Sequence, residues 1–208
     1  DVLRARAALL QTRADKAQAE DNLALVLVQF RQMLGLAPDA EIALDDTVVT
    51  HDLVDMTLAE ALEEALANRI ELAQVRLGVE VARRELELAD NDYTPELTRR
   101  SAELDLAQIE LQMRQAKDGI TLDVHNAYNA MRDAHRRRAL AQQRLLEMEE
   151  NWRVVQALFD ARMATDVEIL QGQTGLAEAR MSAVNAMFDY NVARAKFFQA
   201  IARALDDR

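Results

Sequence analysis

The segment from Val124 to Phe159 carries an almost unbroken apolar stripe, and this stripe constrains the fold more than any other feature. It comprises Val124, Ala127, Met131, Ala134, Arg138, Ala141, Leu145, Met148, Trp152, Val155 and Phe159. These positions recur at alternating spacings of three and four, and Arg138 is the single exception to their apolar character. Such a repeat stays on one side of a helix only when the helix supercoils around a partner. We therefore predict a long, thin helical core.

The composition agrees with an all-helical chain and excludes several classes of function. The 208 residues include only 5 Gly and 2 Pro, and the net charge of −11 disfavours binding to nucleic acid. There is no cysteine, so disulfides and thiolate metal sites are excluded. No apolar run approaches the roughly 20 residues that a transmembrane helix needs, and no signal peptide is visible. Because Asp1 already lies inside an amphipathic pattern, we interpret it as a cut point in a longer precursor.

The first half of the chain predicts three helices and one irregular segment. Residues 1–36 form the first helical arm, which ends at Gly35 with Pro38 just beyond. Residues 37–56 change character, and short strands are possible at Ile42–Leu44 and Val48–Val49. Two helices follow between 57 and 100, separated near Asn68 and Arg69. The first begins with the capping-box pattern Thr57-x-x-Glu60, and the second ends before Tyr93-Thr94-Pro95.

The second half, residues 101–208, predicts one long helical hairpin. Its first helix runs from about Ser101 to about Arg162, and its tip lies near 162–168, where Thr165 or Asp166 caps the next helix. That last helix, to about Leu205, carries two apolar stripes. One contains Ile169, Leu176, Ala183, Met187, Tyr190, Phe197 and Ile201, and the other contains Leu170, Ala177, Met181, Val184, Phe188, Ala195 and Phe198. Two stripes on one helix predict neighbours on both sides.

The two halves are related by a weak internal repeat. Residues 1–36 align without a gap to residues 168–203 at a constant offset of 167. The identities include Leu9 with Leu176, Arg13 with Arg180, Ala19 with Ala186, and Phe30 with Phe197. The repeat indicates two equivalent helical hairpins, of which the first lacks its leading arm.

Several segments, in this order, resemble the TolC-type outer-membrane efflux channel family. Asp1-Val2-Leu3 is similar to the D-V-L that starts a helix leaving a hairpin tip, and Leu34-Gly35-Leu36 is similar to an L-G-L helix end. Residues 65–72 are similar to A-L-x-N-R-P-E-L, with Ile70 in place of the proline. The other matches are Ala89 with Tyr93-x-Pro95-x-Leu97, the tip segment Phe159–Leu170, and Phe188-Asp189-Tyr190 with Ala193.

The resemblance implies a homotrimer in the periplasm and cell outer membrane. Its helical hairpins would form an α-barrel that works with a periplasmic adaptor (membrane-fusion) protein and an inner-membrane pump. The family places strands of its membrane barrel after the proline, whereas only Glu96 to about Ser101 separate Pro95 from the next predicted helix. We therefore expect that part of the barrel to be missing and any membrane contact to depend on it.

The resemblance also implies site residues at the hairpin tip. Asp166, Glu168 and Gln171 are candidates for lining or gating a pore, although carboxylates near a helix N-terminus are also stabilised by the helix dipole alone. We expect Glu168→Ala to alter ion passage without affecting folding. The candidates for contacting an adaptor are Arg162, Met163, Ala164 and Thr165. Arg162 stands where the family has a glycine, so a left-handed turn there is less favourable.

The sequence contains no recognisable catalytic or cofactor-binding pattern. His51, His125 and His135 are scattered, and the last two lie ten residues apart rather than four, so we predict neither a metal site nor a cofactor. Trp152 lies on the heptad stripe and is predicted to be core. We predict that the protein is not an enzyme.

The fold prediction is an all-α, elongated antiparallel coiled coil or helical-barrel protomer with a small mixed equatorial segment. The leading functional hypothesis is a passive export duct, the periplasmic helical conduit of a TolC-like channel. The alternative is a soluble coiled-coil scaffold or a barrel-deleted fragment without channel activity. An amphipathic protein on a lipid surface is disfavoured by the acidic charge and the sparse aromatic residues.

Overall fold

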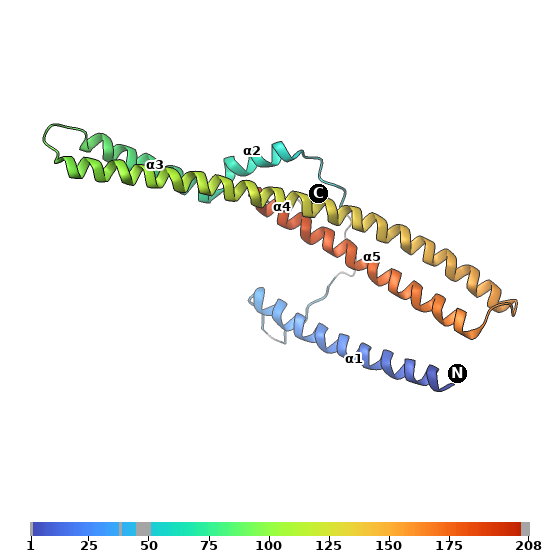
Figure 1. The fold of residues 1–208 in the computed structure, drawn as a ribbon. Coiled ribbons are helices and arrows are strands. Elements are labelled where there is room, and N and C mark those ends of the chain that lie inside the picture. Colours follow the sequence, from blue (N-terminus) through green and yellow to red (C-terminus); the bar gives the residue numbers. More distant parts are fainter. Residues whose placement is uncertain (1, 38, 45–50, 205–208) are drawn as a thin grey trace. The chain divides into compact units, whose positions relative to one another are not determined.

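The computed structural model describes residues 2–37, 39–44 and 51–204 (Figure 1). Within these residues every regular element is an α-helix and no strand is present, so the predicted all-α class is confirmed. The helices are α1 (Val2–Met33), α2 (Leu58–Asn68), α3 (Ile70–Ala89), α4 (Glu96–Asp160) and α5 (Asp166–Ala200). The chain divides into two compact units, residues 1–47 and 48–208, which are described separately.

The first unit consists of α1 and the turn that ends it. The backbone N–H of Gly35 donates to the Gln32 carbonyl over 3.1 Å, and that of Leu36 donates to the Arg31 carbonyl over 2.9 Å. Gly35 has a φ of 68°, which completes a Schellman motif. The Arg31 side chain then donates to the Ala40 carbonyl over 2.7 Å and holds the chain just beyond the turn. The predicted end of this helix is confirmed, while Asp1 and Pro38 lie outside the described residues.

The short strands considered for residues 37–56 are not found where the structure describes this segment. Residues 41–44 and 51–56 have no regular structure, and Val48–Val49 lies outside the described residues. Side chains of α4 and α5, and not a neighbouring strand, bind the carbonyls of His51, Asp52 and Met56. The small mixed segment of the predicted fold is therefore irregular in its described part.

The second unit is built on α4, which has 65 residues and spans about 98 Å at 1.5 Å per residue. The helix α3 lies along its first part, α5 lies along its second part, and α2 lies beside the middle (Figure 1). The predicted long helix is confirmed, but it begins at Glu96 rather than near Ser101. Pro95, with φ −56° and ψ 139°, holds the chain extended up to that point, and its carbonyl accepts from the amides of Thr98 and Arg99.

The interruption predicted near Asn68 and Arg69 separates α2 from α3. Arg69 has an extended backbone (φ −65°, ψ 122°), which ends α2 and starts α3. Its side chain donates through Nε to the Ala200 carbonyl over 2.9 Å, and its Nη2 lies 3.6 Å from a carboxylate oxygen of Asp123. One arginine therefore joins the α2–α3 break to α4 and to the last turn of α5.

The apolar stripe of α4 forms a core whose burial decreases along the helix. Val124, Met131 and Ala134 are at most 1% exposed, where α2 and residues 51–56 also contribute to the core. From Arg138 to Val155 the stripe is only half-buried, and Phe159 is 37% exposed. Trp152, predicted to be core, is half-buried and packs against Gly172, where an added Cβ would lie 3.2 Å from the indole ring.

The face of α5 that packs on α4 alternates large and small residues. Its larger members include Leu176, Tyr190 and Phe197. A second set of positions on this face, spaced seven residues apart, holds only Gly or Ala, namely Gly172, Ala179, Ala186, Ala193 and Ala200. Small residues at this spacing allow the two helix backbones to approach each other closely. The first predicted stripe of α5 is therefore the seam with α4.

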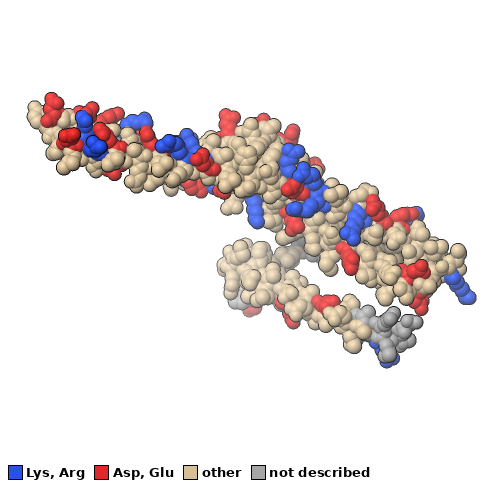
Figure 2. All heavy atoms as spheres, viewed as in Figure 1, with Lys and Arg blue, Asp and Glu red and all other residues tan. Residues whose placement is uncertain are grey.

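The second predicted stripe of α5 is largely uncovered within this unit. Leu170, Met181, Val184 and Phe188 are 51–68% exposed, and only Phe198 near the end of the helix is buried. The expectation of neighbours on both sides is thus met on one side only among the described residues of this unit. Basic and acidic side chains are interspersed along the face of the unit that Figure 2 shows.

The end of α5 repeats the end of α1. The Ala202 amide donates to the Gln199 carbonyl, the Arg203 amide donates to the Phe198 carbonyl, and Ala202 has a φ of 55°. This is the same Schellman motif as at Gly35, at the position that the offset of 167 predicts. The helix ends at Ala200, earlier than predicted, and Leu205 lies outside the described residues.

Candidate functional site

The tip between α4 and α5 is a tight turn over residues 161–165. The amide of Arg162 donates to the Phe159 carbonyl over 2.8 Å, and the amide of Met163 donates to the Leu158 carbonyl over 2.7 Å. Arg162 has a φ of 60°. The turn therefore takes the left-handed conformation expected of a glycine, although an arginine occupies the position and carries the associated steric cost.

A capping box then starts α5. The Glu168 carboxylate accepts from the backbone N–H of Thr165 over 2.7 Å and from its hydroxyl over 2.8 Å, while the Glu168 amide donates to the Thr165 hydroxyl over 3.3 Å. The hydrogen bonds from the Thr165 backbone and side chain hold the pKa of Glu168 below its ordinary value. Of the two residues predicted to cap this helix, Thr165 is the cap.

The three pore candidates lie on the first two turns of α5. Asp166, Glu168 and Gln171 are all exposed. The Glu168 carboxylate forms one half of the capping box, so Glu168→Ala would also remove its hydrogen bonds to Thr165, while the expectation for folding stays a prediction. Asp166 and Gln171 carry no such constraint among the described contacts.

The four adaptor-contact candidates form the turn itself, next to an apolar surface. Arg162, Met163 and Thr165 are exposed, and Ala164 is half-buried. The large apolar side chains on and beside the turn are Leu158 (39% exposed), Phe159 (37%), Met163 (76%), Val167 (53%) and Leu170 (51%). This end of the hairpin therefore presents apolar surface to whatever lies beyond it.

A second cluster, not predicted from the sequence, fastens residues 51–56 to the middle of the hairpin. Arg138 donates through Nη1 to the His51 carbonyl over 2.6 Å, and the Tyr190 hydroxyl donates to the Asp52 carbonyl over 2.5 Å. Tyr128 donates to the Met56 carbonyl over 3.2 Å. We call Arg138, Tyr190 and Tyr128 the central clamp. Its only signal in the sequence was the charged residue in an otherwise apolar stripe.

Aromatic contacts surround the clamp. The ring of His135 meets Tyr190 edge-on with centroids 5.4 Å apart, and Tyr128 meets Phe197 in the same way at 5.8 Å. Burial raises the pKa of the Tyr190 phenol above its ordinary value, and the neighbouring cations Arg138 and Arg194 partly offset this shift. The clamp therefore fixes the chain before α2 with two tyrosine hydroxyls and one guanidinium.

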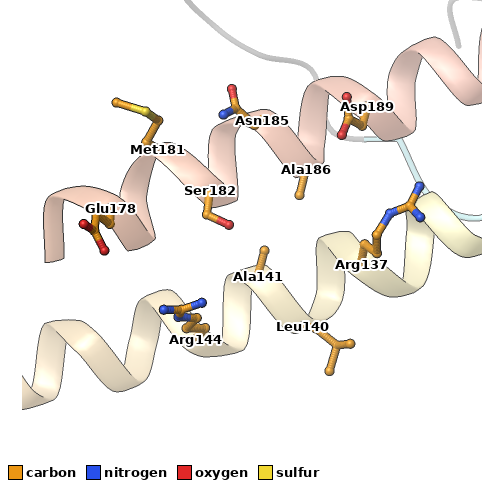
Figure 3. A pocket seen from close by; sticks show the side chains of 10 residues that line it. All are labelled: Arg137, Leu140, Ala141, Arg144, Glu178, Met181, Ser182, Asn185, Ala186 and Asp189. Atoms are coloured by element: carbon orange, nitrogen blue, oxygen red, sulfur yellow. The ribbon is translucent and has the colours of Figure 1, made fainter. Parts of the chain in front are cut away.

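One flank of the α4–α5 hairpin contains an open groove of about 590 Å³ (Figure 3). Arg137 and Arg144 line it from α4, and Glu178 and Asp189 line it from α5. Ala141 and Ala186 lie between these charges. The groove is thus basic along one helix and acidic along the other, with small apolar residues between them.

Nothing in the described part of the chain is arranged for metal binding. Across residues 2–37, 39–44 and 51–204, no three His, Asp or Glu side chains are grouped closely enough to hold an ion. The three histidines are half-buried, and His135 packs on Tyr190.

No described helix has an apolar stretch that is both long and hydrophobic enough to cross a bilayer.

Comparison with models of known protein families and with curated protein sequences finds no match to this chain.

Proposed function

We propose that this chain is the wall element of a passive helical conduit, similar to the periplasmic part of a TolC-type exit duct. The observation that carries the proposal is the second stripe of α5. Leu170, Met181, Val184 and Phe188 are exposed, although they lie on the side of α5 opposite to the seam with α4. A helix with apolar surface on two opposite sides is suited to a curved row of helices that encloses space.

Charge and length also support a conduit. The unit built on α4 is about 98 Å long. The chain carries a net charge of −11, and its acidic residues are spread along the helices. Three copies arranged as a ring would surround a water-filled acidic bore in the periplasm, at the outer membrane. Such a wall needs no catalytic group.

The hairpin tip would form the end of the duct. Its exposed apolar residues, Met163 and Val167 among them, suit an end-to-end contact with the hairpin of a periplasmic adaptor protein, which would connect the duct to an inner-membrane pump. Asp166, Glu168 and Gln171 would line the opening. Of these, Glu168 also closes the capping box, so Asp166 and Gln171 are the better variants for testing ion passage.

The alternative function is a coiled-coil scaffold with no bore. One observation favours it: α3 and α4 are joined directly by the turn at residues 90–95, so the two helices form one continuous hairpin. A scaffold of this kind would work as a monomer or as a simple pair.

Light scattering over a wide concentration range, combined with electron microscopy of end-on particles, distinguishes the two functions. The conduit predicts a trimer whose end-on view is a ring with a central hole. A monomer at every concentration, or a particle without a hole, would refute the conduit and leave the scaffold. Replacing Met181 and Phe188 together with Ser should dissociate the trimer, whereas replacing the still more exposed Tyr93, on the turn between α3 and α4, should not.

A further inference from the structure

The helix α1, in a unit of its own, repeats the packing face of α5. At the offset of 167, the buried residues Leu176, Tyr190 and Phe197 correspond to Leu9, Leu23 and Phe30. These three residues of α1 are 51%, 55% and 38% exposed. Both helices end in the same Schellman motif at corresponding positions. The repeat therefore identifies a face of α1 that is built to lie against other helices.

Arg13 and Asp15 place opposite charges on the two flanks of this face, and Glu20, which lies on the flank of Arg13 seven residues further on, pairs with Lys16 over 3.5 Å. At about 100° per residue, Arg13 and Asp15 lie about 160° apart around α1, one on each side of the line through Leu9 and Leu23. Arg6 lies on the flank of Arg13, and both side chains are exposed. Thr12 and Lys16 make the middle of the face polar.

The groove on the α4–α5 hairpin has the complementary arrangement. Its α4 side is basic, with Arg137 and Arg144, and its α5 side is acidic, with Glu178 and Asp189. Reversing a docked helix with the same face toward the groove exchanges its two flanks, and the right-handed sense of the helix decides which direction places each flank on which side. Only a helix that runs parallel to α5 would place Asp15 over the basic side and Arg13 over the acidic side.

A single register satisfies both flanks. The contacts of His135 with Tyr190 and of Tyr128 with Phe197 show that Arg144 of α4 is level with Met181 of α5. If Asp15 is placed level with Arg144, Arg13 falls beside Glu178. The polar residues Thr12 and Lys16 then lie level with the polar stretch of the groove that contains Glu178 and Ser182. This register differs by one residue from the offset that relates α1 to α5.

We infer that this groove binds α1 of a second copy of the chain, parallel to α5, with Asp15 facing Arg144 and Arg13 facing Glu178. The inference rests on the proposed function, because a closed ring needs each copy to present two different, complementary surfaces. Here one surface is the face of α1 and the other is the groove. The charges of Asp15 and Arg13, each facing an opposite charge of the groove, select the direction and the register of the contact.

Disulfide trapping tests the inference directly, because the chain has no cysteine of its own. Two differently tagged chains, one with Asp15→Cys and the other with Arg144→Cys, are mixed and oxidised, so that only a contact between copies can join the two tags. The mixed disulfide is expected in severalfold excess over the product of Asp21→Cys with Arg144→Cys. Asp21 is also exposed, but it lies on the side of α1 opposite to the docking face.

Charge reversal provides a second test. Asp15→Arg alone and Arg144→Asp alone should each weaken self-association severalfold, and the double variant should restore it. A ring that forms without the expected mixed disulfide would overturn this inference and leave the conduit intact. A third chain carries both Asp15→Cys and Arg144→Cys. If a disulfide forms within this chain but none forms between the two singly substituted chains, the inference is also overturned. A chain that never associates would overturn the proposed function as well.

Discussion

The guanidinium carbon of Arg138 lies 4.6 Å from the centroid of the Tyr190 ring, so the one charged residue of the α4 stripe rests on the face of a buried aromatic ring of α5. The same guanidinium donates to the His51 carbonyl. Arg138 therefore contributes to the α4–α5 seam through a cation–π contact and also holds the segment before α2.

Arg138→Met should destabilise the second unit although it completes the apolar stripe. The variant loses a hydrogen bond from a charged donor and the cation–π contact, and we expect the free energy of unfolding to fall by about 2 kcal/mol. Urea denaturation measures this loss. Arg137→Met, one residue away and exposed, is the matched control and should change stability little. Equal effects of the two variants would show that the clamp does not depend on Arg138.

Alkaline pH should weaken the fold through Tyr190. Burial raises the pKa of its phenol in the folded state, so this group favours folding fully below its ordinary pKa of about 10. That contribution is lost as the pH rises from the ordinary pKa through the higher pKa of the folded state, because Tyr190 loses its proton at a lower pH in the unfolded chain than in the folded protein. Thermal unfolding between pH 9 and pH 11.5 should show this loss in the parent protein and a smaller one in Tyr190→Phe.

Tyr93 provides the control for this pH dependence, because its side chain is 97% exposed. Tyr93→Phe should leave the alkaline loss unchanged. At neutral pH, Tyr190→Phe should cost about 1 kcal/mol, because the hydrogen bond to the Asp52 carbonyl is removed while the ring contacts remain. An alkaline loss that is the same in Tyr190→Phe as in the parent would rule out the buried phenol as its cause.

Thr165→Ala should destabilise the start of α5 by about 1 kcal/mol, because the helix loses its N-cap hydroxyl. Thr57→Ala removes the same type of capping box at α2 and should have a similar effect. Thr174→Ala is the control within α5, since its hydroxyl bonds only to the Leu170 carbonyl of the same helix. Amide hydrogen exchange near the tip would locate the effect, and protection equal to that of the parent would contradict it.

The capping carboxylate of Glu168 should make the stability of the hairpin tip depend on pH in the acidic range. The pKa of Glu168 is held below its ordinary value, so its contribution is present above the unfolded-state pKa and is lost as the pH falls through the lower pKa of the folded state. Glu168→Gln should therefore differ from the parent at pH 7 and approach it towards pH 3. A difference in stability that stays constant over this range would exclude the carboxylate as the source.

Gly119→Ala and Gly172→Ala should behave differently although both glycines lie inside helices. An added methyl group at Gly119 meets nothing within 4 Å, so the helix should gain about 1 kcal/mol from the higher helix propensity of Ala. At Gly172 the methyl group would lie 3.2 Å from the Trp152 ring, which should cancel that gain. The melting temperatures of the two variants measure these changes in stability. Equal gains would show that the Trp152 side chain moves aside without an energetic cost.

The helices and their ends were largely readable from the sequence because the signals are local. The apolar spacing from Val124 to Phe159 predicted α4, Gly35 predicted the end of α1, and the pair Thr57–Glu60 predicted the capping box of α2. Thr165 was one of two residues predicted to cap α5. The start of α4 was placed too late, because a helix beginning directly after Pro95 carries no side-chain cap that would reveal it.

At the candidate site, the sequence correctly located the turn but not the conformation that it adopts. Arg162 takes the left-handed conformation because the two hydrogen bonds that close the end of α4 require it there. Backbone bonding of this kind overrides the preference of a single residue. The structure also gave Glu168 a capping role that its sequence position left open.

The sequence by itself determined an all-helical chain with two apolar stripes on α5, because hydrophobic periodicity belongs to each helix alone. Only the tertiary structure decided which stripe meets α4, and why Arg138 stands in that seam. It also decided that carbonyls of residues 51–56 bind Tyr128, Tyr190 and Arg138 rather than a strand. These hydrogen bonds join side chains to carbonyls that are 72–138 residues away in the chain. No local sequence pattern predicts contacts over such separations.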